Sequence, residues 1–154
     1  MSKNYLGYII VDIDGTLANI SHRRKYVEQK PKDWDKFFAG IKDDTPNKWC
    51  VEIINRFSRT QGSYGIILCT GRMEKHLPET KKWLAKLNIP FDTEIFSRKD
   101  GDFRPDDVVK EEIYLNRIKP EFDPILFVID DRKRVVDMWR RNGLVCLQCD
   151  EGNF

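Results

Sequence analysis

The chain has 154 residues, of which 40% are hydrophobic, 12% are aromatic and 34% are charged. This length suits one domain with a single hydrophobic core, and the hydrophobic content excludes a disordered chain. The 27 Lys+Arg and 25 Asp+Glu residues give a formal charge of +2, which excludes a polycationic, histone-like protein but not a local patch that binds nucleic acid. No apolar run approaches the roughly 20 residues of a membrane helix, and no signal peptide is visible, so we expect a cytoplasmic protein.

Five short apolar segments alternate with helical patterns along the chain. The predicted elements in chain order are a strand at Leu6–Val11, a helix at Lys48–Arg59, a strand at Gly65–Cys69, a helix at Leu77–Leu87, a strand at Thr93–Phe96, a helix at Asp106–Ile118, a strand at Ile125–Ile129, a helix at Arg132–Asn142 and a strand at Leu144–Leu147. Continuous apolar strands are typical of a parallel sheet that is buried on both faces. The alternation therefore predicts an α/β fold with an open, doubly wound parallel sheet.

Residues 17–44 interrupt this alternation directly after the first strand. We interpret them as an insertion over the carboxyl end of the sheet, although an unusually long first crossover helix would also fit. The basic stretch His22–Lys25 could contact nucleic-acid phosphates or could be a solvated loop. Trp34, Phe37 and Phe38 could stack on bases, but their helical spacing favours the core of the insertion itself. Neither His22 nor His76 has an evident ligand partner.

The four cysteines are Cys50, Cys69, Cys146 and Cys149. Without an export signal we expect free thiols. Cys146 and Cys149 have the spacing of half a zinc site, but residues three apart on a strand point to opposite faces, and no second pair completes a site. A structural role is therefore favoured over metal binding.

Two pairs of acidic residues follow predicted strands. Asp12 and Asp14 come directly after the first strand and are followed by Gly15, and Asp130-Asp131 come directly after Ile125–Ile129. Because the carboxyl ends of parallel strands meet at one edge of a sheet, these carboxylates should lie close together. Their repulsion requires a cation or a proton, and carboxylate oxygens suit Mg²⁺. The alternatives are a surface Asp-Gly turn for the first pair and a helix N-cap for the second.

Two further signals could serve a phosphate group. Thr70-Gly71-Arg72 directly follows Gly65–Cys69, and a hydroxyl with a glycine at a helix entry can hold phosphate oxygens, while a guanidinium can bind them in a bidentate manner. Lys110 lies early in the helix that follows Pro105. A single lysine on a helix is usually solvated, but next to the other groups it could balance phosphate and carboxylate charge.

Taken together, these motifs resemble those of the haloacid dehalogenase (HAD) superfamily of phosphotransferases, and all four motifs of that superfamily are present in order. The residues that carry the resemblance are Asp12, Asp14, Thr70, Lys110, Asp130 and Asp131. The resemblance implies a HAD-like Rossmannoid fold, a doubly wound parallel sheet with a small cap insertion after the first strand. It also implies one phosphatase domain over residues 1–154, with the cap at residues 17–44.

The superfamily mechanism implies a role for each of these residues. Asp12 would attack phosphorus and form an aspartyl-phosphate, and Asp14 would protonate the leaving oxygen and then activate water. Thr70 and Lys110 would hold the transferring phosphoryl group. The Mg²⁺ ligands would be Asp12, the main-chain carbonyl of Asp14 and Asp130, with Asp131 orienting this set.

Residues 97–113 and 129–141 look like the phosphatase domain of phage polynucleotide kinase-phosphatases, and the ending Gly152-Asn153-Phe154 is similar as well. This resemblance implies removal of a terminal 3′-phosphate, or of a 2′,3′-cyclic phosphate, from RNA or DNA ends. It implies that Arg72 and Arg98 engage the substrate phosphate beside Gly71. The sequence departs from that family in having no Gly-x-x-x-x-Gly-Lys-Ser/Thr loop, in the threonine at position 70 where relatives have serine, and in residues 17–44.

The leading functional hypothesis is therefore a Mg²⁺-dependent 3′-phosphatase that acts on polynucleotide ends. One alternative is a phosphatase of the same superfamily that acts on nucleotides or other small phosphomonoesters. Another, of a different class, is a non-catalytic nucleic-acid-binding module. A separate kinase or ligase could act with the protein, and the sequence does not indicate the oligomeric state or a preference for DNA or RNA.

Overall fold

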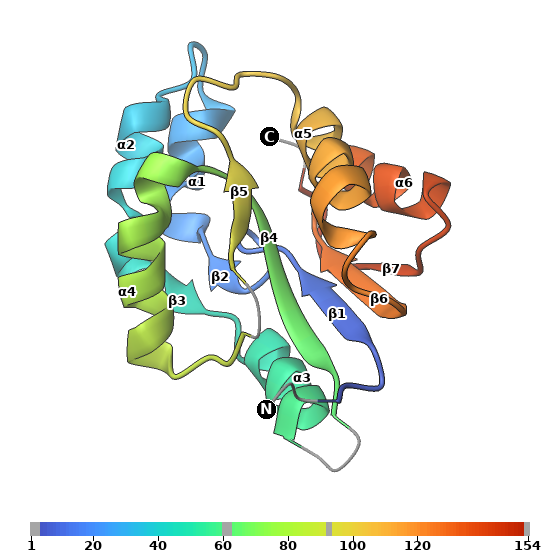
Figure 1. The fold of residues 1–154 in the computed structure, drawn as a ribbon. Helices are drawn as coiled ribbons and strands as arrows, with labels where there is room; N and C mark the ends of the chain where they lie inside the picture. Colours follow the sequence, from blue (N-terminus) through green and yellow to red (C-terminus); the bar gives the residue numbers. More distant parts are fainter. Residues whose placement is uncertain (1–3, 60–62, 92–93, 153–154) are drawn as a thin grey trace.

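The computed structural model describes residues 4–59, 63–91 and 94–152. Its centre is a five-stranded sheet in the order β5-β4-β1-β6-β7, and every neighbouring pair is parallel (Figure 1). The strands are β1 (Tyr8–Val11), β4 (Gly65–Met73), β5 (Phe96–Arg98), β6 (Ile125–Asp130) and β7 (Cys146–Gln148). The predicted α/β fold with a parallel sheet is confirmed. The predicted strand start at Thr93, and Asn153 and Phe154 of the C-terminal ending, lie outside the described residues.

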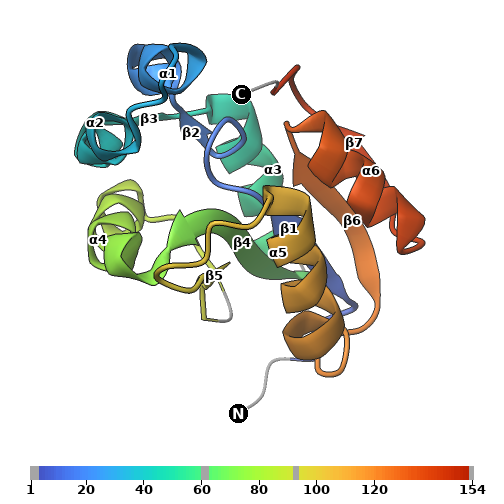
Figure 2. The same ribbon diagram turned by 90° about the horizontal axis from the view of Figure 1, so that it is seen from above.

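Helices cover both faces of the sheet (Figure 2). On one face, α3 (Lys48–Arg59) and α4 (Leu77–Leu87) pack against Ile9 and Val11 of β1. On the other face, Ile10 packs against α5 (Asp106–Ile113), its π-helical continuation η3 (Tyr114–Ile118) and α6 (Lys133–Arg141). Successive residues of a strand point to opposite faces, so an uninterrupted apolar strand supplies both cores at once.

Particular residues explain where α4 begins and where α4 and α6 end. Pro78 occupies the first turn of α4, where its missing N–H has no intrahelical partner, and α4 ends at Asn88 in the left-handed conformation with φ of 50°. Gly143, with φ of 80°, follows α6. The predicted bounds of α3 and α4 agree with the structure, whereas β7 starts at Cys146 instead of Leu144.

Residues 17–44 form short elements beside the sheet, and their buried side chains, among them Val27 and Phe37, join the hydrophobic core on one face of the sheet. These elements are β2 (Ala18–Asn19), α1 (Ser21–Glu28), α2 (Trp34–Ala39) and the short helix η1 (Ile41–Asp43), and β3 (Thr45–Pro46) pairs with β2. α1 packs on α2, and η1 packs on α4. A short helix η2 (Glu74–His76) precedes α4. The alternative of one long crossover helix is wrong, and the basic stretch His22–Lys25 lies on α1, not in a loop.

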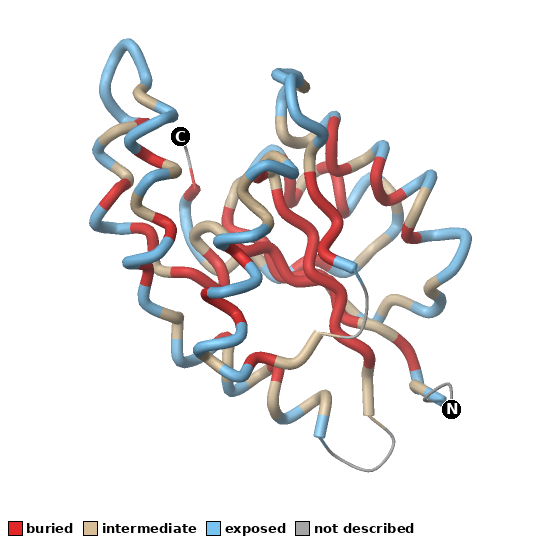
Figure 3. Tube along the Cα trace, turned by 60° about the vertical axis from the view of Figure 1, so that its left-hand side comes forward, coloured by how far each residue is buried: buried red, intermediate tan, exposed pale blue. Residues whose placement is uncertain are grey.

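Burial follows the strands and the inner sides of the helices (Figure 3). The four cysteines are free thiols, as expected, and burial raises the pKa of each to about 12. Within the described residues, no helix is both long enough and apolar enough to cross a membrane.

Candidate functional site

Three carboxylates meet where β1 and β6 end. Asp12 follows β1, Asp130 is the last residue of β6, and Asp131 follows it. Each of them is at most 5% exposed, and one carboxylate oxygen from each lies within 4.8 Å of the others. The structure therefore brings together three of the predicted metal ligands, because parallel strands deliver their carboxyl ends to one edge.

Lys110 on α5 lies between two of these carboxylates. Its Nζ donates to Asp12 Oδ1 at 2.8 Å and to Asp130 Oδ2 at 2.9 Å. Lys110 is 1% exposed, so the reading of this residue as a solvated surface lysine is wrong. Burial alone would lower the pKa of Lys110, but Asp12 and Asp130 raise it well above its ordinary value. We call Asp12, Asp130, Asp131 and Lys110 the acidic centre.

The acidic centre has more negative than positive charge. Burial, and then the charge of Asp130, raise the pKa of Asp12 well above its ordinary value. The same causes raise the pKa of Asp131 to about 6. A Cβ at Gly15, where φ is 81°, would collide with Asp131 Oδ2, so the chain passes close to this carboxylate only because the residue is glycine. Three oxygen donors with unrelieved repulsion fit a hard divalent cation such as Mg²⁺.

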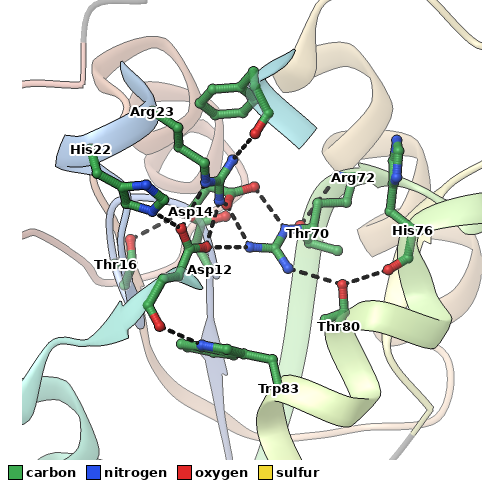
Figure 4. A network of polar contacts seen from close by, with 12 residues as sticks. Asp12, Asp14, Thr16, His22, Arg23, Thr70, Arg72, His76, Thr80 and Trp83 are labelled. Carbon is green, nitrogen blue, oxygen red and sulfur yellow. Dashed lines mark hydrogen bonds and ion pairs between the residues drawn. The ribbon is translucent and has the colours of Figure 1, made fainter. Parts of the chain in front are cut away.

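Asp14 has a different environment from its neighbour Asp12. Its carboxylate accepts from Arg23 at 2.5 Å and from Arg72 at 2.6 Å and 3.0 Å (Figure 4). Burial alone would raise the pKa of Asp14, but the guanidiniums of Arg72 and Arg23 outweigh it and hold that pKa well below its ordinary value. In this structure Asp14 is ionised and bound to two arginines.

Asp44, just after η1, bonds both of these arginines. It accepts from Arg23 Nε and NH2 at 2.7 Å each and from Arg72 NH2 at 3.3 Å. His22 bonds Asp44 at 2.8 Å, and Trp83 Nε1 donates to the Asp44 carbonyl at the same distance. The side chain of Asp44 has no exposed surface. We call Asp14, Asp44, Arg23 and Arg72 the arginine–aspartate network.

The structure limits the hypothesis about the basic stretch to its exposed residues. Arg23 is 1% exposed and bonds carboxylates, so it is not presented to solvent for a nucleic-acid strand. His22 bonds Asp44, a contact that the sequence did not indicate. Arg23 and Asp44 were not among the site residues predicted from the sequence. The one sequence feature that pointed to Arg23 was its position in an insertion expected to lie over the strand ends. No sequence feature pointed to Asp44.

Thr70, Gly71 and Arg72 lie inside β4 and not at a helix entry, which corrects the prediction. The strand continues through Met73, which pairs with Arg98 of β5. Thr70 is fully buried, and its Oγ1 accepts the N–H of Arg72 at 3.2 Å. A Cβ at Gly71 would collide with Asp106 Oδ1, so close packing explains this glycine.

Arg98 is bonded to the loop that follows it. Its guanidinium donates to Asp106 Oδ1 and to the carbonyls of Gly71, Asp102 and Arg104, at 2.6–2.9 Å. Arg72 likewise donates to Asp14, Asp44 and Thr80 Oγ1, the last at 2.9 Å. A contact of either arginine with a substrate phosphate would thus replace bonds that this structure already contains.

A cavity of about 460 Å³ opens above these groups. The predicted site residues that line it are Asp12, Asp14, Gly71, Arg72, Arg98, Asp130 and Asp131. Thr70 and Lys110 are buried, and Lys110 bonds two of the lining carboxylates. The cavity therefore combines buried carboxylates and an ammonium group with the guanidiniums of its lining arginines. This combination is suited to an anionic ester and a divalent cation.

Comparisons with known proteins agree with this chemistry. The family model described as the polynucleotide kinase PNKP phosphatase domain matches residues 7–154. Two chains from structures of the Pnkp1/Rnl/Hen1 complex, one of them described as an RNA repair complex, are 32% and 31% identical, with TM-scores of 0.80 and 0.78. The matches cover 96% and 99% of this chain but only 43% and 49% of those chains. A class C acid phosphatase from Bacillus anthracis, solved with tungstate, has the same fold at 13% identity, with a TM-score of 0.67 over 99% of this chain and 69% of that one.

Proposed function

Because the chain belongs to the polynucleotide kinase PNKP phosphatase domain family, we propose that it removes 3′-terminal phosphates from polynucleotide ends in a Mg²⁺-dependent reaction. The family and the fold make the chain a HAD-type phosphatase. The observation that supports the detailed proposal best is the acidic centre at the cavity, where Asp12 is held by a buried lysine and faces two further carboxylates.

Asp12 is the proposed nucleophile. Lys110 Nζ holds Asp12 Oδ1 at 2.8 Å, and Thr16 Oγ1 donates to Asp12 Oδ2 at 3.0 Å. An oxygen of this carboxylate would attack phosphorus, the bond between phosphorus and the sugar oxygen would break, and an aspartyl-phosphate would form. Water would then release phosphate and regenerate Asp12. The Thr70 hydroxyl accepts an N–H from Arg72, so its own proton is available to a phosphoryl oxygen.

Asp14 is the proposed acid and base. In the structure Arg23 and Arg72 keep it ionised, so in this pairing it cannot act as an acid. Phosphate oxygens that enter the cavity would compete with Asp14 for these guanidiniums. Loss of the pairing would raise the pKa of Asp14 and prepare it to protonate the leaving oxygen. Once substrate has displaced the guanidiniums, Asp14 would take up a proton from solvent and pass it to the leaving oxygen.

The proposed Mg²⁺ ligands are Asp12, Asp130 and the main-chain carbonyl of Asp14, with Asp131 orienting the set. Burial of the carboxylates and their mutual repulsion, which together raise the pKa values of Asp12 and Asp131, support this assignment. When bound, Mg²⁺ would offset charge on the phosphoryl oxygens, which two anions need in order to react. Trp139 Nε1 and Lys110 Nζ both donate to Asp130 Oδ2 and fix this carboxylate.

A phosphatase of small phosphomonoesters is the second candidate. The phosphate-binding groups of the cavity would serve it equally well. The insertion does not favour it, because the family model matches residues 7–154 and so includes residues 17–44. A kinase or ligase step in another chain or domain is part of the first candidate. One related structure is an RNA repair complex, which supports such a step. The non-catalytic module is disfavoured because the reactive carboxylates Asp12 and Asp14 are both present and line the cavity.

One assay separates these candidates. Phosphate release with Mg²⁺ is measured from a 3′-phosphorylated oligonucleotide, from the same oligonucleotide phosphorylated at its 5′ end and from nucleoside monophosphates. We expect the first to have the highest kcat/KM, and Asp12→Asn to reduce it by about 10³-fold or more. Equal or faster turnover of the monophosphates would favour the second candidate. Equal, slow release by the wild type and Asp12→Asn from all substrates would leave only the binding module.

A further inference from the structure

The cavity has two exposed aromatic side chains among its lining residues, and neither has a role in the chemistry. Trp34 at the start of α2 is 43% exposed, and Phe103 in the loop between β5 and α5 is 85% exposed. Their segments are far apart in sequence, and both reach the upper end of the molecule in Figure 1. Phe103 is the most exposed large hydrophobic side chain in the described part of the chain. An exposed ring at a catalytic cavity indicates a surface for a ligand.

The backbone on both sides of Phe103 is fixed although its ring is exposed. Arg98 NH1 donates to the carbonyl of Asp102 at 2.9 Å and to that of Arg104 at 2.6 Å. The Arg104 guanidinium in turn bonds Asp102 at 2.7 Å and Glu112 at 2.8 Å. Arg98 thus closes the loop around Phe103. A loop whose backbone is fixed before binding loses little conformational freedom when a ligand covers its side chain.

Trp34 is also supported from behind. Its ring is stacked on Phe38 at 5.9 Å and contacts Phe37 edge to face at 5.7 Å. The N-cap of α2 is closed by Asp33, whose side chain accepts the N–H of Lys36. The ammonium of Lys32 lies 5.5 Å from the centre of the Trp34 ring, so a flexible cation covers part of this aromatic surface, and a stacked planar group would replace it.

We propose that Trp34 and Phe103 form a binding site for the base of the terminal nucleotide, whose phosphate lies at Asp12. This inference rests on the proposed phosphatase function and specifies which phosphomonoesters the cavity selects. Stacking accepts any base, because every base has a π-face, so the site would distinguish nucleotides from phosphates without a base but would not read sequence. The exposed Lys32 and Lys75 also line the cavity and suit the neighbouring phosphodiester.

Kinetics on two matched oligonucleotides test this site. Both have a 3′-phosphate, and they differ only in whether the terminal nucleotide has a base or is abasic. We expect the wild type to have a KM about tenfold lower for the substrate with the base. Trp34→Ala and Phe103→Ala should each remove most of that difference, with kcat and the KM of the abasic substrate unchanged. Trp34→Phe should restore it.

The matched control is Trp49→Ala. Trp49 on α3 is 42% exposed, close to the value for Trp34, and it does not line the cavity. It should leave both KM values unchanged. Equal KM values for the two oligonucleotides in the wild type would overturn the proposal. So would alanine variants that raise both KM values equally, because that result indicates a general role in access or folding.

A binding measurement separates failure of this site from failure of the phosphatase function. The anisotropy of the two labelled oligonucleotides is followed as Asp12→Asn protein is added. We expect Asp12→Asn protein to bind the oligonucleotide with the base more tightly, and the double variant with Phe103→Ala to lose this preference. That result supports the base site even if the wild type hydrolyses neither substrate. Hydrolysis of both substrates with equal binding would keep the phosphatase function and reject the base site.

Discussion

Two groups of buried charges meet at the cavity, and they differ in how their charges are balanced. The acidic centre has three carboxylates and one ammonium, and the pKa values of Asp12 and Asp131 in it are raised. The arginine–aspartate network has two carboxylates and two guanidiniums, which bond one another directly. The first group is incomplete without a cation, whereas the second satisfies itself. The net charge of a buried cluster therefore separates a group that can bind a cation from a group whose members neutralise and orient one another.

Removal of the one cation in the acidic centre should have the largest effect. Lys110→Met keeps the length of the side chain, but it removes the ammonium group that donates to the buried carboxylates of Asp12 and Asp130. We expect a loss of about 3–5 kcal/mol in the free energy of unfolding without Mg²⁺, because an unpaired buried charge is costly. Urea unfolding with and without Mg²⁺ measures this, and Mg²⁺ should recover part of the loss. If Lys110→Met were as stable as the wild type without metal, Lys110 would not offset the charge of the buried carboxylates.

Asp44→Asn tests the balanced network. Asp44 contacts both arginines, so the amide should leave Arg23 and Arg72 partly unpaired. We expect a loss of about 2–3 kcal/mol in the free energy of unfolding and a fall in kcat at nearly constant KM, since Asp14 would lose its orientation. Added Mg²⁺ should not restore this loss, in contrast to Lys110→Met.

The control for this variant is Asp43→Asn, an exposed neighbour on η1. It removes the same charge from the same segment without touching the network. Equal effects of the two substitutions on kcat would show that only the net charge of the insertion matters and that Asp44 does not position Arg23 and Arg72.

Stabilisation by Mg²⁺ should depend on pH in a defined direction. The pKa of Asp131 is raised to about 6, so the folded protein binds a proton that the unfolded chain releases near pH 4. Without metal, the contribution of Asp131 to stability should fall as the pH rises from about 4 to about 6, by on the order of 2 kcal/mol. The shift in Tm caused by Mg²⁺ should therefore be larger at pH 7.5 than at pH 5. Equal shifts at both pH values would exclude a contribution from the repulsion among these carboxylates.

The sequence predicts the acidic centre well and the arginine–aspartate network poorly, for a physical reason. Asp12 and Asp130 end strands, and parallel strands bring such ends together whatever the rest of the chain does. Asp44 and Arg23 meet only because the insertion folds back on the strand ends, and no local pattern encodes that packing. Gly71 favours a turn in sequence, yet β4 continues through it because Asp106 packs where a side chain would be. Lys110 became a candidate only beside the acidic pairs and Thr70, since its burial depends on carboxylates that are distant in sequence.

The smallest expected effect comes from the exposed part of the basic stretch. Lys25 lies two positions after Arg23 on the same helix, but it is exposed and its ammonium lies over the ring of Tyr26 at 5.1 Å. Lys25→Gln should change the KM for a 3′-phosphorylated oligonucleotide by less than about twofold, and mainly at low salt, where exposed charges are least screened. Arg23→Gln should instead lower kcat at all salt concentrations, because Arg23 bonds Asp14 directly. A large, salt-dependent effect of Lys25→Gln would show that α1 contacts the polynucleotide through its outer face as well, and it would extend the functional surface beyond the two buried charge groups.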